Sequence, residues 1–145
     1  MRGAPAAASV ATTRPLCFEA GVFRAVLVGM GGLFGSLARY WLAGTVQACT
    51  ESGLPFGTLT VNVVGSFIVG LVMVLSLERG LLNAEMRLLL AVGVCGGFTT
   101  MSTFSYETVA LLRDGEVMLA LGNVGVTIVV CFVAVWFGAL IGRLL

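Results

Sequence analysis

The chain has 145 residues, of which 59% are hydrophobic and 10% are charged, and its mean hydropathy is +1.07. A soluble domain carries about 25% charged residues, so this composition excludes a small soluble fold and predicts an integral membrane protein. The eight basic residues are all arginine, histidine is absent, and the formal net charge is +1. No basic stripe is present, so no nucleic-acid partner is expected. The 20 glycines are about twice the average frequency of ~7%, which favours closely packed helices.

Residues 1–21 are expected to form a disordered N-terminal extension, because Arg14 and Pro15 interrupt the apolar run that a signal peptide would need. Residues 22–145 are expected to form a single transmembrane domain. The four cysteines lack the paired spacing of a zinc site and are expected to behave as small hydrophobic residues. They are Cys17, Cys49, Cys95 and Cys131.

The first predicted span runs from Phe23 to Leu42, long enough to cross about 30 Å of hydrocarbon. Gly31 and Gly35 form a small-residue pattern that permits close helix packing. Arg39 ends this span, and two interpretations remain open for it. It is either an interfacial anchor beside an aromatic belt or a cation that faces an aqueous vestibule and attracts anions.

A polar connection from Ala43 to Phe56 is expected to lead into a second span, Thr58 to Leu77. Thr58, Asn62 and Ser66 recur at i+4 spacing and therefore share one helical face. A threonine or serine can bond its own helix's carbonyls, but the amide of Asn62 brings donors that lipid cannot satisfy. Asn62 is therefore predicted either to bond another helix or to line a pore.

The third predicted span runs from Met86 to Leu112. It contains the stretch from Gly93 to Glu107, which the other spans are expected to hold in place. Glycines loosen its backbone, and five hydroxyl residues follow within six positions. Free backbone groups in hydrocarbon cost several kcal/mol, so such a segment survives only against protein or a water-filled path. A helix break is predicted between Gly96 and Ser102, and polar sequence of this kind at membrane depth indicates an ion or substrate site.

The fourth predicted span, Val117 to Ile141, carries Asn123, Thr127 and Cys131 on one face. The sequence thus predicts an all-α membrane protein with four spans, a broken third helix and both termini on the same side. No nucleophile beside a base, no phosphate-binding loop and no metal-ligand cluster is found, so an enzyme is not expected.

The inward-facing groups are mostly neutral hydrogen-bond donors, whereas a proton-coupled pump would place ionisable groups in its path. Such a path, with Arg39 as a guarding cation, suits a small hydrated anion. Two interpretations are open for Phe104: it is either a core or lipid-facing residue, or it presents its positive ring edge to that path. A chain with four spans encloses a wide pore poorly, so association is expected, and symmetric dimers are the commonest oligomers.

Three motifs resemble those of the Fluc/CrcB family of fluoride channels. They are GGLFGSLARY at Gly31 to Tyr40, GTLTVNVVGSFIVG at Gly57 to Gly70 and GGFTTMSTFSYE at Gly96 to Glu107. Their order and their positions on the predicted spans make the resemblance specific, and it covers residues 22–143.

The resemblance implies an antiparallel dual-topology dimer in a bacterial plasma (inner) membrane, with two fluoride pores and a structural sodium ion on the two-fold axis. It implies sodium ligands at the backbone carbonyls of Gly96 and Thr99, and a vestibule arginine at Arg39. The pore-lining positions that it implies are Thr58, Asn62, Met101, Phe104, Glu107, Asn123, Thr127 and Cys131.

Two residues depart from the family's pattern. Met101 stands where a first phenylalanine is usual, and a thioether has no positive ring edge. Cys131 stands where a serine-type hydroxyl is more usual, and a thiol is a weaker donor. Met101 therefore cannot supply the ring edge of the usual phenylalanine, and the point of the path at Cys131 is expected to matter less here.

The arginines are unevenly distributed between the two faces of the predicted bundle. The face that carries the termini has most of them, and the other has Arg113, with Arg39 nearby. This bias favours cytoplasmic termini, while an antiparallel homodimer needs both orientations. A heterodimer with an oppositely oriented paralogue is therefore an alternative to the homodimer.

The sequence thus favours a fluoride-specific channel that exports cytoplasmic fluoride passively and reduces its toxicity, with fluoride, sodium and membrane lipid as partners. One alternative is a small drug/proton antiporter, which would need an acidic residue in the middle of the first span, where Phe23 to Leu42 has none. A second alternative is a non-transporting assembly subunit, with polar residues at helix contacts and no flux.

Overall fold

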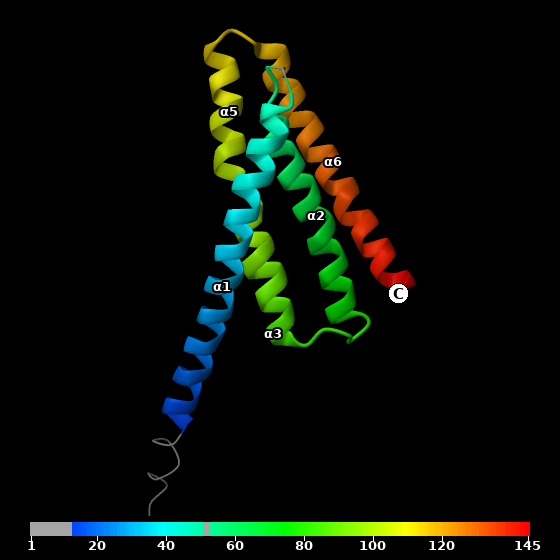
Figure 1. Cartoon of the computed structure of the whole chain (residues 1–145). Coiled ribbons are helices and arrows are strands. Elements are labelled where there is room, and N and C mark those ends of the chain that lie inside the picture. Colours follow the sequence, from blue (N-terminus) through cyan, green and yellow to red (C-terminus); the bar gives the residue numbers. More distant parts are fainter. Residues whose placement is uncertain (1–12, 51–52) are drawn as a thin grey trace, which may run out of the picture.

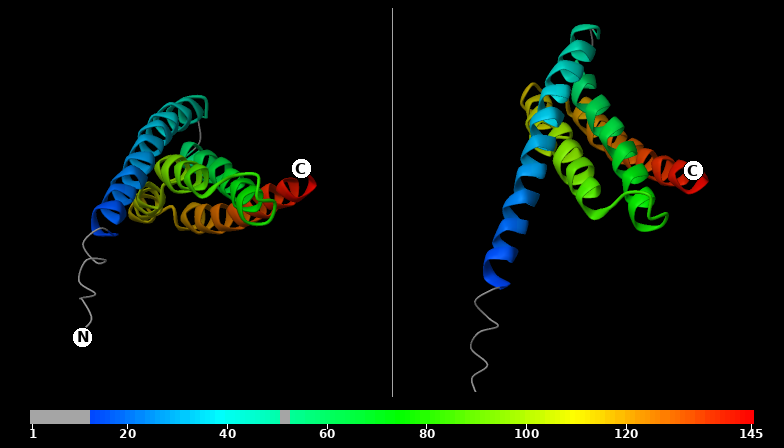
Figure 2. Two further views of the ribbon diagram at one scale, coloured as in Figure 1. Left: turned by 90° about the horizontal axis from the view of Figure 1, so that it is seen from below. Right: turned by 60° about the horizontal axis from the view of Figure 1, so that its bottom comes forward.

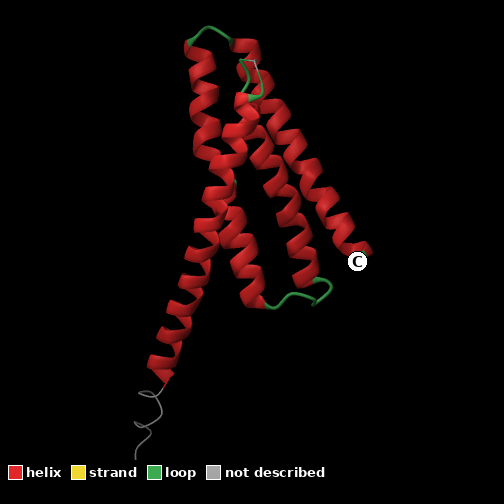
Figure 3. Ribbon diagram, viewed as in Figure 1, coloured by secondary structure: helices red, strands yellow, loops and turns green. Residues whose placement is uncertain are grey.

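The computed structural model of the chain describes residues 13–50 and 53–145. Every regular element in this part is helical, as Figure 3 shows. The elements are α1 (Thr13–Ala48), α2 (Phe56–Leu77), α3 (Ala84–Arg87), the π-helical segment η1 (Leu88–Cys95), α4 (Gly96–Phe98), α5 (Met101–Arg113) and α6 (Val117–Leu144).

Four helical stretches are long and apolar enough to cross a membrane, which confirms the predicted number of spans. They are Gly21–Ala48, Phe56–Leu77, Ala84–Arg113 and Val117–Leu144. In Figure 1, α1 and the third span rise while α2 and α6 descend. The start of α1, the loop before α3 and the C-terminus therefore lie toward the same end, and the other two connections lie at the opposite end.

The first helix is longer than predicted at both ends. Helix α1 begins at Thr13 and continues to Ala48, so it extends past the predicted end at Leu42. The connection between the first two spans is therefore shorter than the predicted Ala43 to Phe56, because α1 continues to Ala48 and α2 begins at Phe56. Of the predicted extension 1–21, residues 1–12 lie outside the described residues.

The connections at the two ends of the bundle are short, and local chemistry determines where the helices start and stop. The side chain of Asn83 accepts a hydrogen bond of 2.8 Å from the backbone N–H of Met86 and caps the start of α3. Gly80 and Gly115 adopt positive φ angles of +65° and +80° in their turns, a conformation that glycine reaches without steric cost.

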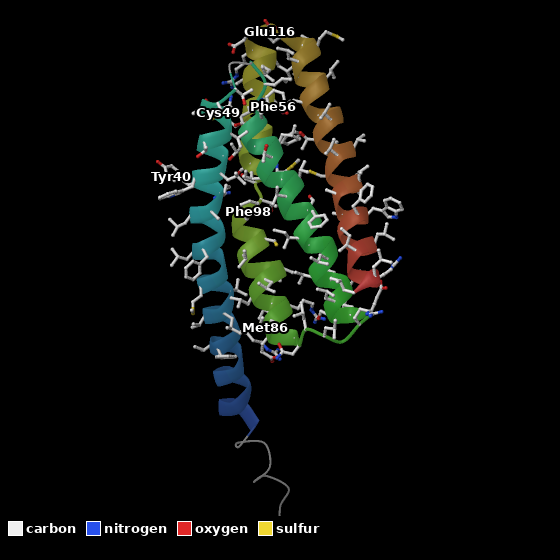
Figure 4. The ribbon with its side chains drawn as sticks, turned by 45° about the vertical axis from the view of Figure 1, so that its right-hand side comes forward. Tyr40, Cys49, Phe56, Met86, Phe98 and Glu116 are labelled. Carbon is white, nitrogen blue, oxygen red and sulfur yellow. The ribbon has the colours of Figure 1, made fainter. Side chains whose placement is uncertain are left out.

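Helix α1 packs on η1, α4 and α2, whereas the most extensive contact of the bundle is between α2 and α6. Figure 2 shows that α1 and α6 lie on opposite flanks, with α2 and the third span between them. Side chains project outward all around the bundle in Figure 4, as expected for helices that face lipid. By contrast, α5 makes few contacts with its neighbours.

Glycines let the helices approach closely at both contacts. A Cβ atom added to Gly35 would collide with the carbonyl oxygen of Val94, and one added to Gly31 would lie 2.6 Å from that of Leu89. On the other flank, a Cβ atom at Gly70 or Gly138 would collide with backbone of the facing helix. The predicted close packing at Gly31 and Gly35 is confirmed.

A surface ion pair joins the ends of α2 and α6. Arg143 donates through Nε and Nη2 to the two carboxylate oxygens of Glu78, at 2.9 and 3.0 Å. This hydrogen bonding holds the pKa of Glu78 below its usual range. The carboxylate therefore stays charged, and the pair intact, until the pH falls below the ordinary range for glutamate.

The cysteines within the described part are free thiols in different surroundings. Cys49 is exposed near the end of α1, Cys95 is 2% exposed, and Cys131 is half-buried on α6. Burial supports the hydrophobic interpretation for Cys95, whereas Cys49 and Cys131 remain accessible. The side chain of Cys17 lies outside the described part.

We predict that Gly35→Val destabilises the fold, because the added side chain forces α1 away from η1 and α4. Overpacking of this kind costs about 1–3 kcal/mol. Gly29→Val is the matched control, since Gly29 lies on the same helix and a Cβ atom there meets nothing within 4 Å. Thermal unfolding of the detergent-purified variants measures the difference, and equal melting temperatures would contradict the packing argument.

Candidate functional site

The third span is interrupted near its middle by two extended residues. Helix α4 ends at Phe98, Thr99 has φ −82° and ψ 158°, Thr100 has φ −150° and ψ 113°, and α5 begins at Met101. This confirms the predicted break and places it within the predicted range. The side-chain oxygen of Thr100 caps α5 by accepting a hydrogen bond of 3.3 Å from the N–H of Thr103.

Asn62 bonds both peptide groups of Thr100 and so satisfies the N–H that the break leaves without a helical partner. The N–H of Thr100 donates to Asn62 Oδ1 at 2.8 Å, and Asn62 Nδ2 donates to the carbonyl oxygen of Thr100 at 3.2 Å. Both residues are buried. The interhelical hydrogen bond that was one interpretation of Asn62 is therefore present. The amide carries two N–H donors, and Thr100 takes one of them.

Gly65 explains why the break fits so closely against α2. It lies one turn from Asn62, and a side chain there would collide with the methyl group of Thr99. The motif that contains Asn62 and Gly65 therefore supplies both the hydrogen-bonding partner of the break and the space for it.

Two further polar pairs hold α5 in place. Thr58 Oγ1 donates to Glu107 Oε1 at 2.8 Å and joins α5 to α2. Asn123 Nδ2 donates to Thr108 Oγ1 at 2.9 Å and joins α5 to α6. Since α5 makes few other contacts, these bonds and the Asn62–Thr100 pair do much to position it. Sequence reasoning missed Thr108, although it lies one turn beyond Phe104 on the same face.

A groove with a volume of about 440 Å³ opens beside the break. Its walls come from α2, the break, the start of α5 and the middle of α6. The lining residues are Asn62, Ser66, Val69, Thr99, Thr100, Met101, Phe104, Thr127, Ile128, Cys131, Phe132 and Val135. Ser66 and Thr100 were not among the predicted pore-lining residues, although the i+4 spacing from Asn62 pointed to Ser66.

The groove contains a hydrogen-bonding group without a partner. Thr127 is 7% exposed, and its Oγ1 has no hydrogen-bond partner among the described residues. A buried hydroxyl in this condition costs about 1–3 kcal/mol, so it marks a place where a bound ion or water would be favourable. Glu107 Oε2, outside the groove, is also buried without a partner in the described part.

The structure divides the predicted pore-lining residues into two groups. Asn62, Met101, Phe104, Thr127 and Cys131 line the groove. Thr58, Glu107 and Asn123 lie outside its lining, among the polar pairs of α5.

Asn123, Met101 and Phe104 differ in the cavity that they border or in their exposure to solvent. Asn123 borders a separate cavity of about 220 Å³ near the start of α2. Met101 is 71% exposed, whereas Phe104 is buried. A pore-lining role for any of these residues stays a prediction.

Arg39 lies beside the break. Its Nη1 donates to the carbonyl oxygen of Thr99 at 3.4 Å, and its side chain is half-buried. Helix α1 continues from Arg39 to Ala48, about two and a half further turns. The predicted end of this span at Leu42 is therefore wrong, and the Arg39 charge lies at the depth of the break. A vestibule role for Arg39 stays a prediction.

The carbonyl groups predicted to hold sodium differ in their fit to a cation. Helix α4 ends before Thr100, and the N–H of Thr100 bonds Asn62, so the Gly96 carbonyl loses the donor of a continuous helix. Gly96 is exposed, with open space beside it. An oxygen in this condition suits a hard cation. The Thr99 carbonyl fits less well, because the Arg39 guanidinium already approaches it.

Comparisons with known proteins identify the family of this chain. The family described as "CrcB-like protein, Camphor Resistance (CrcB)" matches residues 26–139, which contain the break, the groove and Arg39. This chain belongs to the CrcB family. The match confirms the resemblance that the three sequence motifs indicated.

Relatives within the CrcB family are similar over nearly their whole length. A protein from Thermus thermophilus is 50% identical over 127 residues, covering 84% of this chain and 99% of the relative. A protein from Geobacter metallireducens is 49% identical over 118 residues, covering 81% and 95%. One from Geobacter sulfurreducens is 47% identical over 116 residues, covering 80% and 94%. All three are named "Fluoride-specific ion channel FluC", so this is a family of channels and not of enzymes.

We predict that Asn62→Asp lowers stability, because a carboxylate has no N–H to donate to the Thr100 carbonyl. Loss of one hydrogen bond of this kind costs about 0.5–1.5 kcal/mol. Asn83→Asp is the control, because aspartate and asparagine cap helices about equally well and Asn83 is exposed. Thermal unfolding of both variants compares them, and an unchanged melting temperature in Asn62→Asp would show that the break does not depend on this amide.

Proposed function

We propose that this chain is a fluoride-specific ion channel that lets cytoplasmic fluoride leave passively and so reduces fluoride toxicity. The observation that carries the proposal is its membership of the CrcB family, with relatives of that name up to 50% identical over nearly their whole length. The site of action is a bacterial plasma (inner) membrane, because the chain has four spans and its named relatives come from bacteria.

The chemistry of the groove supports an anion pathway. Its polar lining consists of amide and hydroxyl groups and one thiol, with no arginine or carboxylate. Neutral donors stabilise a small anion without trapping it as a fixed cation would. Thr127 supplies a hydroxyl without a protein partner, and Arg39 places a positive charge near the same depth.

The same observations oppose the drug/proton antiporter. A proton-coupled carrier needs an ionisable group at membrane depth that exchanges a proton for its substrate. The span Gly21–Ala48 contains no acidic residue. Glu107, on α5, lies outside the groove lining and receives a hydrogen bond from Thr58.

Passive export follows from the chemistry of the ion. Hydrogen fluoride crosses lipid as a neutral weak acid and dissociates inside, where the anion is retained. A membrane potential that is negative inside contributes about 2.3 kcal/mol per charge for each 100 mV to outward movement. A selective channel therefore suffices without coupling to another energy source.

A single chain leaves the proposed pathway open on one side, which supports assembly as an antiparallel pair. Met101, Ser102, Thr103 and Ser105 are exposed at or beside the break, near the middle of a span. The three hydroxyls have local hydrogen-bond partners, but a cluster of polar side chains at this depth is typical of a surface that faces protein or water. In the proposed dual-topology dimer, an inverted second copy covers them and completes the wall of each groove.

We propose that a structural Na⁺ holds the two breaks together on the two-fold axis. The open carbonyl of Gly96 supports this proposal, and the carbonyl of Thr99 is its second ligand. Hard cations accept neutral oxygen ligands such as backbone carbonyls, which suits the carbonyls exposed at the break. Because Arg39 approaches Thr99, its guanidinium must turn away from that carbonyl when the cation binds.

One observation supports the alternative of a non-transporting assembly subunit. It requires polar residues at helix contacts, and Asn62, Thr58 and Asn123 do bond neighbouring helices. Structural bonding and ion permeation are compatible in the same residues. A flux measurement therefore decides between them.

We predict fluoride efflux from proteoliposomes that contain the purified chain, measured with a fluoride-selective electrode after a potassium diffusion potential is imposed with valinomycin. Asn62→Asp should lose the flux, because it places a negative charge in the groove, and Asn83→Asp should keep it. Replacement of Na⁺ by N-methyl-D-glucamine throughout purification should also abolish the flux, and restored Na⁺ should recover it. Absence of efflux in Na⁺ would defeat the channel, provided that the chain inserts in both orientations.

The orientation of the chain separates a homodimer from a heterodimer with an oppositely oriented paralogue. Arg24, Arg79, Arg87 and Arg143 lie toward the end that carries the termini, and Arg113 lies at the other. We propose the homodimer, which requires both orientations despite this bias. Reporters fused to the C-terminus should then be active in comparable amounts on both sides of the membrane. A strong cytoplasmic excess would contradict the homodimer and identify the paralogue as the partner.

A further inference from the structure

Two sulfur-containing side chains face the same groove from different helices. Met101 comes from the start of α5 and Cys131 from the middle of α6, and both line the 440 Å³ groove. Among the described residues, Cys49 and Cys95 are absent from its lining. The two residues that depart from the family's pattern, Met101 in place of a phenylalanine and Cys131 in place of a serine-type residue, therefore both line this groove.

The groove gives this thiol the access and the partner that a metal-binding site needs. Cys131 is a half-buried free thiol, and Met101 lines the same groove with an unbranched side chain that has several rotatable bonds. Thiolate and thioether are soft ligands, which select soft metal ions over Na⁺, Mg²⁺ or Ca²⁺. Histidine is absent from the chain, and the groove has no carboxylate that would favour a hard cation.

Thr127 provides a separate indication that the groove receives a bound group near Cys131. It precedes Cys131 by one turn on α6, it is more than nine-tenths buried, and its hydroxyl has no partner among the described residues. The wall at this point thus presents an unused hydroxyl beside a thiol. An ion fixed there would occupy the position that Thr127 makes favourable for a passing anion.

We propose that Cys131 and Met101 form a binding site for a soft, thiophilic metal ion, and that the bound ion closes the groove to fluoride. This proposal rests on the proposed function for its effect on flux, but not for the binding itself. With mercuric chloride as the probe, the Cys131 thiol loses its proton to buffer, a sulfur–mercury bond forms, and one chloride leaves mercury. The thioether of Met101 then approaches the mercury from the opposite wall.

The first experiment measures fluoride efflux before and after micromolar mercuric chloride, with each variant normalised to its own flux without metal. The unmodified chain should lose most of its flux and recover it after dithiothreitol. Cys131→Ser should resist the metal. Cys49→Ser, which removes an exposed thiol outside the groove, should remain fully sensitive. Met101→Leu should need about tenfold more mercury, the usual effect of losing a supporting ligand.

The second experiment measures binding without any flux. A variant with Cys131 as its sole cysteine (Cys17→Ser, Cys49→Ser, Cys95→Ala) should bind one mercury per chain by intact-protein mass spectrometry. Flux without metal tests the channel, whereas these measurements test the metal site. Undiminished block in Cys131→Ser, or no mercury bound to the sole-cysteine variant, would overturn the site. Equal sensitivity of Met101→Leu and the unmodified chain would overturn the participation of the thioether.

Discussion

The structure depends on the need to satisfy a peptide N–H in the middle of a membrane span. Where the third helix breaks, the N–H of Thr100 lacks a helical partner, and hydrocarbon offers none. The side chain of Asn62, on the neighbouring helix, accepts from this N–H and also donates to the Thr100 carbonyl. This contact fixes the depth of the break and the start of α5 against α2, on which α6 also packs.

The bundle is built from two kinds of contact that perform different tasks. Backbone-to-backbone packing at glycines fixes α1 against the lower half of the third span and α6 against α2. Polar side chains fix α5, which has little packing of its own, through Asn62, Glu107 and Thr108. Of the residues that position the upper half of the third span, Asn62 and Thr100 also line the groove. A change of Asn62 therefore alters shape and chemistry together.

Much of the fold was predictable because membranes limit the chain to a few choices. Span number, the location of the start of α1 and of the C-terminus at one end, and the break followed from apolar length and from the hydroxyl run after Gly96. The end of α1 was misplaced, because Arg39 was read as the limit of its span, whereas the guanidinium finds the Thr99 carbonyl at depth. Periodicity placed Asn62, Thr127 and Cys131 on inward faces, but the polar pairs of Glu107 and Thr108 depend on the angle between helices, which spacing does not define.

The parallel course of α2 and α6 has a consequence for how the chain is made. These two helices share the most extensive contact, yet the whole third span separates them along the chain. During synthesis, α2 enters the bilayer first, and the surface around Gly70 must face lipid until α6 arrives. A ribosome adds about 5–20 residues each second, so this surface is exposed for seconds. In that interval α2 can pack against an incorrect helix, and the contact is complete only after α6 has inserted.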